Sequence, residues 1–378
     1  MKGRLVFIDL LRGWATIVMI EVHVFNAFLV PSLKQTSWFR ILNYVNGWVA
    51  PSFLFVAGFV FVIASGRKLQ DFRTFGKAFW RQIGRISLIW IVGYGLHLPF
   101  FSFTRTINET TQSGWLQFYQ SDILHCIAIG LLIVFIGRIF IKSDAAYQKF
   151  LVLTGLGFVL AAPFLWDIDF TRSLPAWIAA YLNGQHYSLF PIFPWIGFLI
   201  FGAVTAIRYQ NAKASGKEFD YLKLVGLLSG VLIPAGILLN ELPVRIPFAA
   251  SALRASPLFF ATRLGIVLLL MLLCWYYAER RKTEKSFVLY VGRESLVVYT
   301  AHLLVIYGQF WNEKSLAYWY GGTFSVIQSI VGTLGLMILM VAGAKLWGAI
   351  KRRSLTTARI LSYATGLVVL LVFFLKES

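Results

Sequence analysis

The sequence predicts an all-α, polytopic integral membrane protein with about eleven membrane-spanning helices. Hydrophobic residues make up 58% of the 378-residue chain, charged residues make up only 13%, and the mean hydropathy is +0.72. A soluble globular protein could not present a wettable surface with so apolar a composition. Runs of about 20 apolar residues, the length that crosses a bilayer as a helix, recur along the chain. The linkers are mostly too short to fold alone, which predicts one integral domain over residues 1–378.

The expected spans are the apolar runs that lie between polar segments. In chain order they are 5–30, 47–66, 79–99, 121–141, 150–166, 188–207, 222–239, 257–278, 287–310, 323–349 and 357–375.

The basic residues predict the orientation of the chain. If the N-terminus is cytoplasmic, most of the 35 Lys and Arg residues fall in inner segments and few fall in outer ones. Since cytoplasmic loops of membrane proteins are rich in Lys and Arg, we expect a cytoplasmic N-terminus and an extracytoplasmic C-terminus. The outer segments are longer and rich in aromatic residues, which is typical of an interfacial belt and also suits a substrate vestibule.

Charge and cysteine usage exclude other classes of function. The formal net charge of +19 could indicate a nucleic-acid partner, but the basic residues are spread between spans and form no continuous groove, so we expect none. Cys126 and Cys274 lie inside apolar segments and report no redox compartment. His97, His125 and His186 lie on separate segments without close ligand spacing, so no metal site is expected.

The first span carries side chains that a lipid-facing helix avoids. Each ionisable group at depth costs roughly 2.5 to 3.5 kcal/mol on insertion scales, which requires a reason. At about 100° per residue, Arg12 and His23 share one helix face about 16 Å apart. Asp9 and Asn26 lie on the same stripe, whereas Glu21 points away from it.

Each of these two residues has a structural and a functional interpretation. Arg12 could extend to the inner headgroups with Asp9 as its partner. His23 lies deeper, and an imidazole near neutral pH is a natural proton acceptor. The structural alternative for His23 is a hydrogen-bonded histidine in a helix bundle.

A second polar stripe lies in the span 287–310. Ser295, Tyr299 and His302 follow i, i+4, i+7 spacing and so share a helical face, which predicts the wall of a substrate-binding pocket. Ser and Tyr also join transmembrane helices through ordinary hydrogen bonds, so that alternative stays open.

Arg263 is another costly charge within a span, 257–278, and predicts a carboxylate or phosphate that neutralises it. Asp9, Glu21 and Asp122 are the candidate carboxylates, and a substrate anion is the functional alternative.

Several stretches resemble a known family. The run IDLLRGWATIVMIEVH, followed by NGWVAPSFLFVAGF, is similar to the catalytic domain of heparan-alpha-glucosaminide N-acetyltransferase and its bacterial relatives. Arg12 and His23 also fit the Arg-x10-His signature of bacterial membrane O-acyltransferases that decorate surface polysaccharides. The resemblance is clearest over 4–310, and 323–375 adds two further helices. Later stretches that agree, in order, are SDILHCIAIGLL, YSLFPIFPWIGFLIFGAVTA, SPLFFATRLGIVLLL and VGRESLVVYTAHLLVIYG.

The resemblance implies a membrane acyltransferase. It would move an acyl group, most simply acetyl, from cytoplasmic acyl-CoA to a hydroxyl or amine of an extracytoplasmic saccharide, with Arg12 and His23 as the matching functional residues and His23 as general base. In the lysosomal branch the active-site histidine lies in the first luminal loop, whereas 31–45 contains no histidine. The O-acyltransferase-like role of His23 therefore fits better than glucosamine N-acetylation.

The thioester carbonyl would need a hydrogen-bond donor for its developing oxyanion. Candidate donors are Asn26, Asn46 and Trp48, and Asn46 also fits a helix N-cap at the start of the second span. On the inner side, Arg67, Lys68, Arg81 and Arg85 form a basic loop that suits the phosphates of the donor. Positive-inside topology predicts such a loop as well.

Membrane lipids, acyl-CoA and the saccharide acceptor are the expected partners, and a bacterial cytoplasmic membrane is the expected location. The oligomeric state is left open, a homodimer included. The competing function is a secondary transporter or lipid flippase, but the inverted repeats common in transporters are not visible in this sequence.

Overall fold

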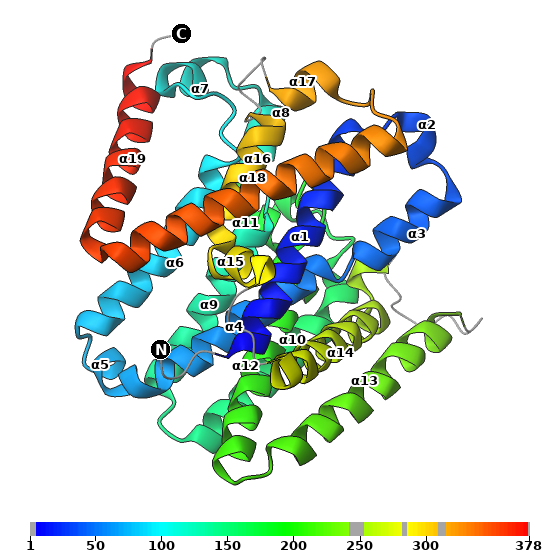
Figure 1. Cartoon of the computed structure of the whole chain (residues 1–378), viewed down its shortest axis with the longest axis vertical. Helices are drawn as coiled ribbons and strands as arrows, with labels where there is room; N and C mark the ends of the chain where they lie inside the picture. The colour runs from blue at the N-terminus through cyan, green and yellow to red at the C-terminus, as the bar shows by residue number, and fades with distance from the viewer. Residues whose placement is uncertain (1–4, 242–252, 282–285, 309–314, 377–378) are drawn as a thin grey trace. The chain divides into compact units, whose positions relative to one another are not determined.

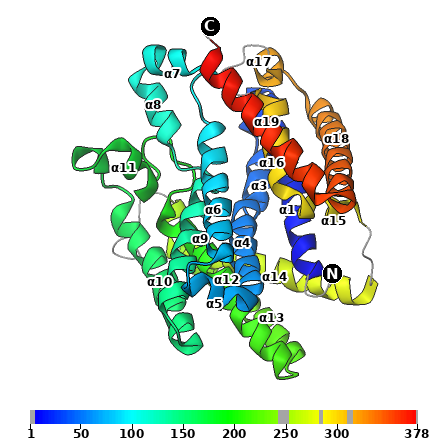
Figure 2. The same cartoon turned by 90° about the vertical axis from the view of Figure 1, so that its left-hand side faces the viewer.

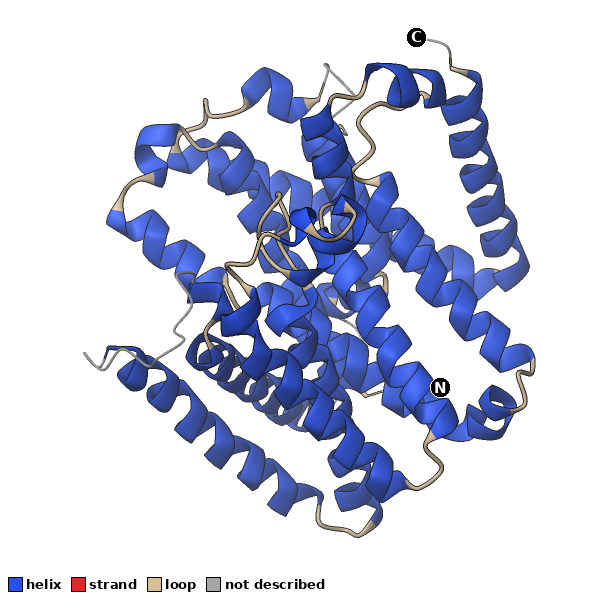
Figure 3. Ribbon diagram, turned by 180° about the vertical axis from the view of Figure 1, so that it is seen from behind, coloured by secondary structure: helices blue, strands red, loops and turns tan. Residues whose placement is uncertain are grey.

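The regular elements of the structure, a computed structural model, are helices. It describes residues 5–241, 253–281, 286–308 and 315–376 (Figure 1). Within these ranges one isolated bridge pairs Leu29 with Phe324, and the remaining residues form loops and turns (Figure 3). The all-α prediction is confirmed.

Eight helical spans in the described ranges are long and apolar enough to cross a membrane. They are Ser37–Ser65, Ile123–Phe140, Asp144–Leu165, Ile192–Ala214, Glu218–Leu239, Pro257–Arg281, Val326–Arg353 and Leu355–Leu375. The chain is therefore a multi-pass membrane protein. Helices also cover most of the predicted spans 5–30 and 79–99, but these helices are not among the eight. The count of eleven spans therefore remains a prediction, as does the orientation of the chain.

The span predicted over 287–310 is wrong as one continuous helix. The chain forms two helices, Phe287–Arg293 and Ser295–Tyr307, bent by 91° at a break between them, and 309–310 lie outside the described residues. Glu294 at the break has φ −112° and ψ 27°, outside helical geometry. The break carries two charged residues, and each of them pairs with a different neighbouring helix, as described below.

The helices cluster into two compact units. The first unit comprises Met1–Val49, Gly95–Phe118 and Ala278–Ser378. Its helices are α1 (Val6–Phe28), α2 (Pro31–Lys34), α3 (Ser37–Asn46), α7 (Phe103–Glu109), α8 (Gln112–Tyr119), α15 (Phe287–Arg293), α16 (Ser295–Tyr307), α17 (Leu316–Tyr320), α18 (Val326–Arg353) and α19 (Leu355–Leu375).

The second unit comprises Ala50–Tyr94 and Tyr119–Tyr277. Its helices are α4 (Val49–Ser65), η1 (Gly66–Lys68), α5 (Leu69–Arg73), α6 (Lys77–Gly95), α9 (Ile123–Phe140), α10 (Asp144–Leu165), η2 (Phe170–Arg172), α11 (Ala176–Leu182), α12 (Ile192–Ala214), α13 (Glu218–Glu241), η3 (Leu253–Ala255) and α14 (Pro257–Arg281).

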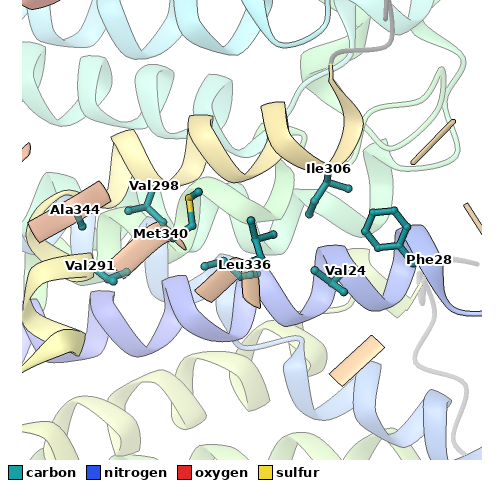
Figure 4. Close-up of a cluster of buried hydrophobic side chains, with 9 residues drawn as sticks. Val24, Phe28, Val291, Val298, Ile306, Leu336, Met340 and Ala344 are labelled. Atoms are coloured by element: carbon teal, nitrogen blue, oxygen red, sulfur yellow. The ribbon is translucent and has the colours of Figure 1, made fainter. Parts of the chain in front are cut away.

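The core of the first unit lies where α1, α15, α16 and α18 meet. Buried side chains from all four helices pack together there, and α1 contributes three of them in steps of four residues (Figure 4). The cluster contains Ile20, Val24, Phe28, Val291, Val298, Ile306, Leu336, Met340 and Ala344. Figure 2 shows α19 following α18 after a tight turn, and the surface of α19 is largely exposed and apolar, as suits contact with lipid.

Two glycines let α1 and α15 approach closely. A Cβ atom built on Gly13 would lie 2.2 Å from the carbonyl oxygen of Val288, and one on Gly292 would lie 2.1 Å from that of Asp9. Small residues at such crossings allow transmembrane helices to pack backbone against backbone. The second unit repeats the device, because α4 and α12 cross at Gly58 and Gly202.

We expect Gly292→Ala to destabilise the first unit by about 1 to 3 kcal/mol, because the added methyl group meets backbone that cannot rotate away. Thermal unfolding in detergent measures the effect. The matched control is Gly335→Ala on α18, where a Cβ atom meets no other atom within 4 Å. Equal unfolding midpoints for both variants would contradict the close approach.

Candidate active site

Two histidines from distant parts of the chain meet in the first unit. His23 lies on α1 and His302 on α16, and the His23 Nδ1 and His302 Nε2 atoms are 2.8 Å apart. Their rings are stacked, with centroids 5.0 Å apart and planes 25° from parallel. His302 is fully buried and His23 is half-buried. The two polar stripes predicted on separate helices therefore meet through their histidines.

Aromatic rings surround the histidine pair. The Tyr307 ring lies edge-on to His23 at a centroid distance of 6.3 Å, and the Tyr299 ring lies 5.8 Å from that of His302. Tyr299 is buried, as its predicted inward face requires, whereas Ser295 is the half-buried first residue of α16. Tyr307 is a site residue that the sequence reasoning missed, although it lies five residues after His302.

Asn46 contacts another face of α1. Its Nδ2 atom donates to Glu21 Oε2 at 2.6 Å. Glu21 and His23 are two residues apart and so about 200° apart around the helix, which separates this hydrogen bond from the histidine pair. The N-cap alternative for Asn46 is wrong, because Asn46 is the last residue of α3 and α4 begins at Val49.

The two other predicted oxyanion donors are Asn26, near the end of α1, and Trp48. Asn26 is exposed, and its amide donates to the carbonyl of Val22 in the preceding turn. Lys34 donates to the carbonyl oxygen of Asn26 at 2.6 Å, and burial lowers the pKa of the Lys34 amine. Trp48 is half-buried between α3 and α4.

Ion pairs gather at the break between α15 and α16. Arg293 Nε lies 3.5 Å from Asp9 Oδ2 of α1, and the Glu294 carboxylate pairs with Lys351 of α18. Neither Arg293 nor Glu294 is among the site residues predicted from the sequence. The signal was present, because adjacent opposite charges inside an apolar run are as costly as those that marked α1.

Asp9 therefore serves as a partner of Arg293. Arg12, eleven residues before His23, is half-buried, and its carbonyl oxygen accepts from the Thr16 hydroxyl at 2.8 Å. Since Asp9 and Glu21 each bond within the first unit, they have partners other than Arg263.

Arg263 lies in the second unit on α14 and is buried, with its guanidinium over the Phe259 ring at 5.2 Å.

Of the predicted phosphate-binding residues, Lys68 ends η1, while Arg81 and Arg85 are exposed one turn apart on α6. The Arg67 side chain lies outside the described part of the chain. Arg81 and Arg85 thus present two cations on one helix face.

A polar cluster orders the segment between α10 and α12. The Asp169 carboxylate accepts from the Thr171 hydroxyl at 2.6 Å and lies 3.0 Å from His186 Nε2. These two hydrogen bonds, that of Thr171 first, lower the pKa of Asp169 from 3.8 to about 2. The cluster ties residues that are 17 positions apart.

The low pKa of Asp169 predicts a pH-dependent loop. A carboxyl group whose pKa is lower in the folded state stabilises that state above the unfolded value, and the contribution disappears as pH falls. We expect protection of 166–190 to decline between pH 3.8 and about 2, the ordinary and folded pKa values. Pepsin, which is active in this window, measures the protection. Asp169→Asn should remove the pH dependence and Asp167→Asn should keep it; loss of the dependence in both variants would refute the assignment.

Among the described residues, no three His, Cys, Asp or Glu side chains gather in a way that could hold a metal ion.

Comparison with known proteins identifies the family. The model of one family, described as heparan-alpha-glucosaminide N-acetyltransferase, catalytic, matches residues 4–231, more than half of the chain. The match includes α1 with Arg12 and His23 and ends before α16 with His302. No curated protein matches the chain. The resemblance is confirmed over the matched residues, and the chain belongs to the heparan-alpha-glucosaminide N-acetyltransferase catalytic-domain family of membrane acetyltransferases.

Proposed function

We propose that this protein transfers an acetyl group from cytoplasmic acetyl-CoA to a hydroxyl or amine of an extracytoplasmic saccharide, with His23 as general base. Family membership supports acetyl transfer with acetyl-CoA as the donor. The observation that carries the base assignment is the hydrogen bond between His23 and His302, which holds an imidazole on the matched helix α1. A base oriented by a second group is the usual arrangement of an activating histidine.

The reaction balances with one base. His23 takes the proton of the acceptor as its oxygen or nitrogen attacks the thioester carbonyl. The tetrahedral intermediate then collapses, its carbon–sulfur bond breaks, and the proton on His23 passes to the departing CoA sulfur. Asn26 and Trp48 are proposed as donors to the oxyanion. Asn46 is the weaker candidate, because its amide donates to Glu21 on a face of α1 that points away from His23.

The donor and acceptor are proposed to approach α1 from opposite ends. With a cytoplasmic N-terminus, Arg12 lies toward the donor side and His23 toward the acceptor side, about 16 Å apart along the helix. Arg67, Lys68, Arg81 and Arg85 are proposed to bind the phosphates of CoA. Ser295, Tyr299 and Asp9 are proposed to line or order a substrate pocket in the first unit. Arg263, in the second unit, is proposed to meet a substrate anion. A bacterial cytoplasmic membrane is the proposed location.

Purified protein in proteoliposomes tests the proposal. Acetyl-CoA is supplied on one side, a panel of amino sugars, glycans and lipid-linked saccharides on the other, and free CoA thiol is measured. We expect CoA release by the parent protein and by His97→Ala, and loss of release in His23→Ala. Absence of acetyl-CoA binding at any usable concentration would overturn the proposal.

The break between α15 and α16 favours a second candidate, because discontinuous helices are common in secondary transporters. The same vesicles distinguish the two functions. Uptake of an unmodified saccharide without consumption of acetyl-CoA would support transport and contradict acetyl transfer.

A further inference from the structure

The hydrogen bonds of His302 determine which of its nitrogens carries the proton. His302 Nδ1 lies 2.8 Å from the carbonyl oxygen of Val298, one turn earlier on α16. A carbonyl oxygen accepts hydrogen bonds and cannot donate them, so His302 Nδ1 carries the hydrogen. A neutral His302 then presents a lone pair at Nε2.

The same reasoning extends to His23. Its Nδ1 atom lies 2.8 Å from His302 Nε2, so the His23 Nδ1–H donates and the His302 lone pair accepts. The reverse direction would require a hydrogen on both nitrogens of His302. That would place an imidazolium on a side chain with 0% of its surface exposed, beside a second imidazole and the Tyr299 ring. The chain of hydrogen bonds therefore runs from His23 to His302 to the Val298 carbonyl, and it leaves His23 Nε2 without a hydrogen.

We infer that His302 is a positioning residue that fixes the tautomer of His23, so that Nε2 is the nitrogen that accepts the proton of the acceptor. The inference rests on the proposed function of His23 as base. During the reaction the proton of the acceptor goes to Nε2 while Nδ1 keeps its own, and Nε2 later gives the proton to the CoA sulfur. In the protonated interval the bond from Nδ1 to His302 becomes charge-assisted and stabilises the imidazolium.

The placement of His302 has a consequence for the whole chain. It lies on α16, beyond the family match at 4–231, while His23 lies within the match. The matched segment supplies the base and the C-terminal part of the chain supplies the group that orients it. His302 therefore acts through His23, and His302 itself need not touch the substrate.

Nitrogen-15 NMR of histidine-labelled protein in lipid nanodiscs tests the tautomer directly. The signals of His23 are identified by their loss in His23→Ala. We expect a proton on His23 Nδ1 and a bare Nε2 in the parent protein. A proton on Nε2 instead would overturn the inference. This measurement needs no turnover, so it separates the two hypotheses. If the protein shows the expected tautomer but transfers no acetyl group, the proposed function is refuted and the tautomer assignment stands.

Variants of His302 separate positioning from packing. His302→Phe keeps an aromatic ring but offers no acceptor, and we expect kcat to fall by about 10²-fold while KM for acetyl-CoA is unchanged. His302→Gln offers an amide oxygen to His23 Nδ1 and should recover part of kcat and the Nδ1-protonated signal. Two results would overturn the positioning role. One is full activity in His302→Phe; the other is an equal loss of kcat in His302→Phe and His302→Gln while His23 keeps the tautomer of the parent protein.

Discussion

Replacing His23 with alanine is expected to lower the rate of acetyl transfer by about 10²- to 10⁴-fold, the usual contribution of a positioned general base. The acceptor would then have to lose its proton to water while it attacks the thioester. KM for acetyl-CoA should change little, because the imidazole acts on the acceptor. The measurement is CoA release at saturating donor, with thermal unfolding in detergent as a check on folding.

Imidazole added to the solution provides the sharpest control for His23→Ala. The cavity left beside His302 is bordered by Tyr307 and can receive a free imidazole, which should restore part of the rate. No such recovery is expected for His97→Ala, which should keep parental activity throughout. Parental activity in His23→Ala would show that another residue is the base.

Replacing Asp9 with alanine is expected to destabilise the first unit by about 3 kcal/mol, because it removes the buried carboxylate that neutralises the half-buried Arg293. The Arg293 and Asp9 side chains are only 18% and 6% exposed, and their atoms lie 3.5 Å apart. Removing Asp9 leaves the Arg293 charge with little solvent to compensate it. The midpoint of thermal unfolding in detergent measures the loss.

The double variant Asp9→Ala/Arg293→Met distinguishes lost charge compensation from lost packing. It removes both charges and keeps an apolar side chain of similar length at 293, so it should be more stable than Asp9→Ala alone. The exposed pair of Arg105 and Glu109 on α7 is the matched control, where Glu109→Ala should cost less than about 1 kcal/mol. A double variant no more stable than Asp9→Ala would contradict the compensation.

Local patterns predicted most helices well. Ten of the predicted spans correspond to one helix each, because length and apolarity are properties of a continuous stretch. The tenth and eleventh, for example, appear as Val326–Arg353 and Leu355–Leu375. The prediction of one continuous helix over 287–310 was wrong, because this stretch contains no proline that would mark a break. Its interruption at Glu294 coincides with ion pairs to α1 and α18, which no local pattern contains.

In the candidate site, too, some features could be predicted from the sequence and others could not. Helical periodicity placed Ser295, Tyr299 and His302 on one face and separated Glu21 from His23, because those angles depend only on 3.6 residues per turn. It could not assign partners. The sequence left three carboxylates open for Arg263, and the structure gives two of them, Asp9 and Glu21, to Arg293 and Asn46.

Composition and local patterns are enough to predict a helical membrane protein, a resemblance to a membrane acetyltransferase family, and an arginine and a histidine on one face of the first helix. Tertiary structure alone decided that His23 meets His302, 279 positions later in the chain. The physical reason is that a helix face is set by neighbouring residues, whereas its partner is set by which helices pack closely. Here that packing depends on Gly13 and Gly292, which bring α1 against α15 just before the chain bends into α16.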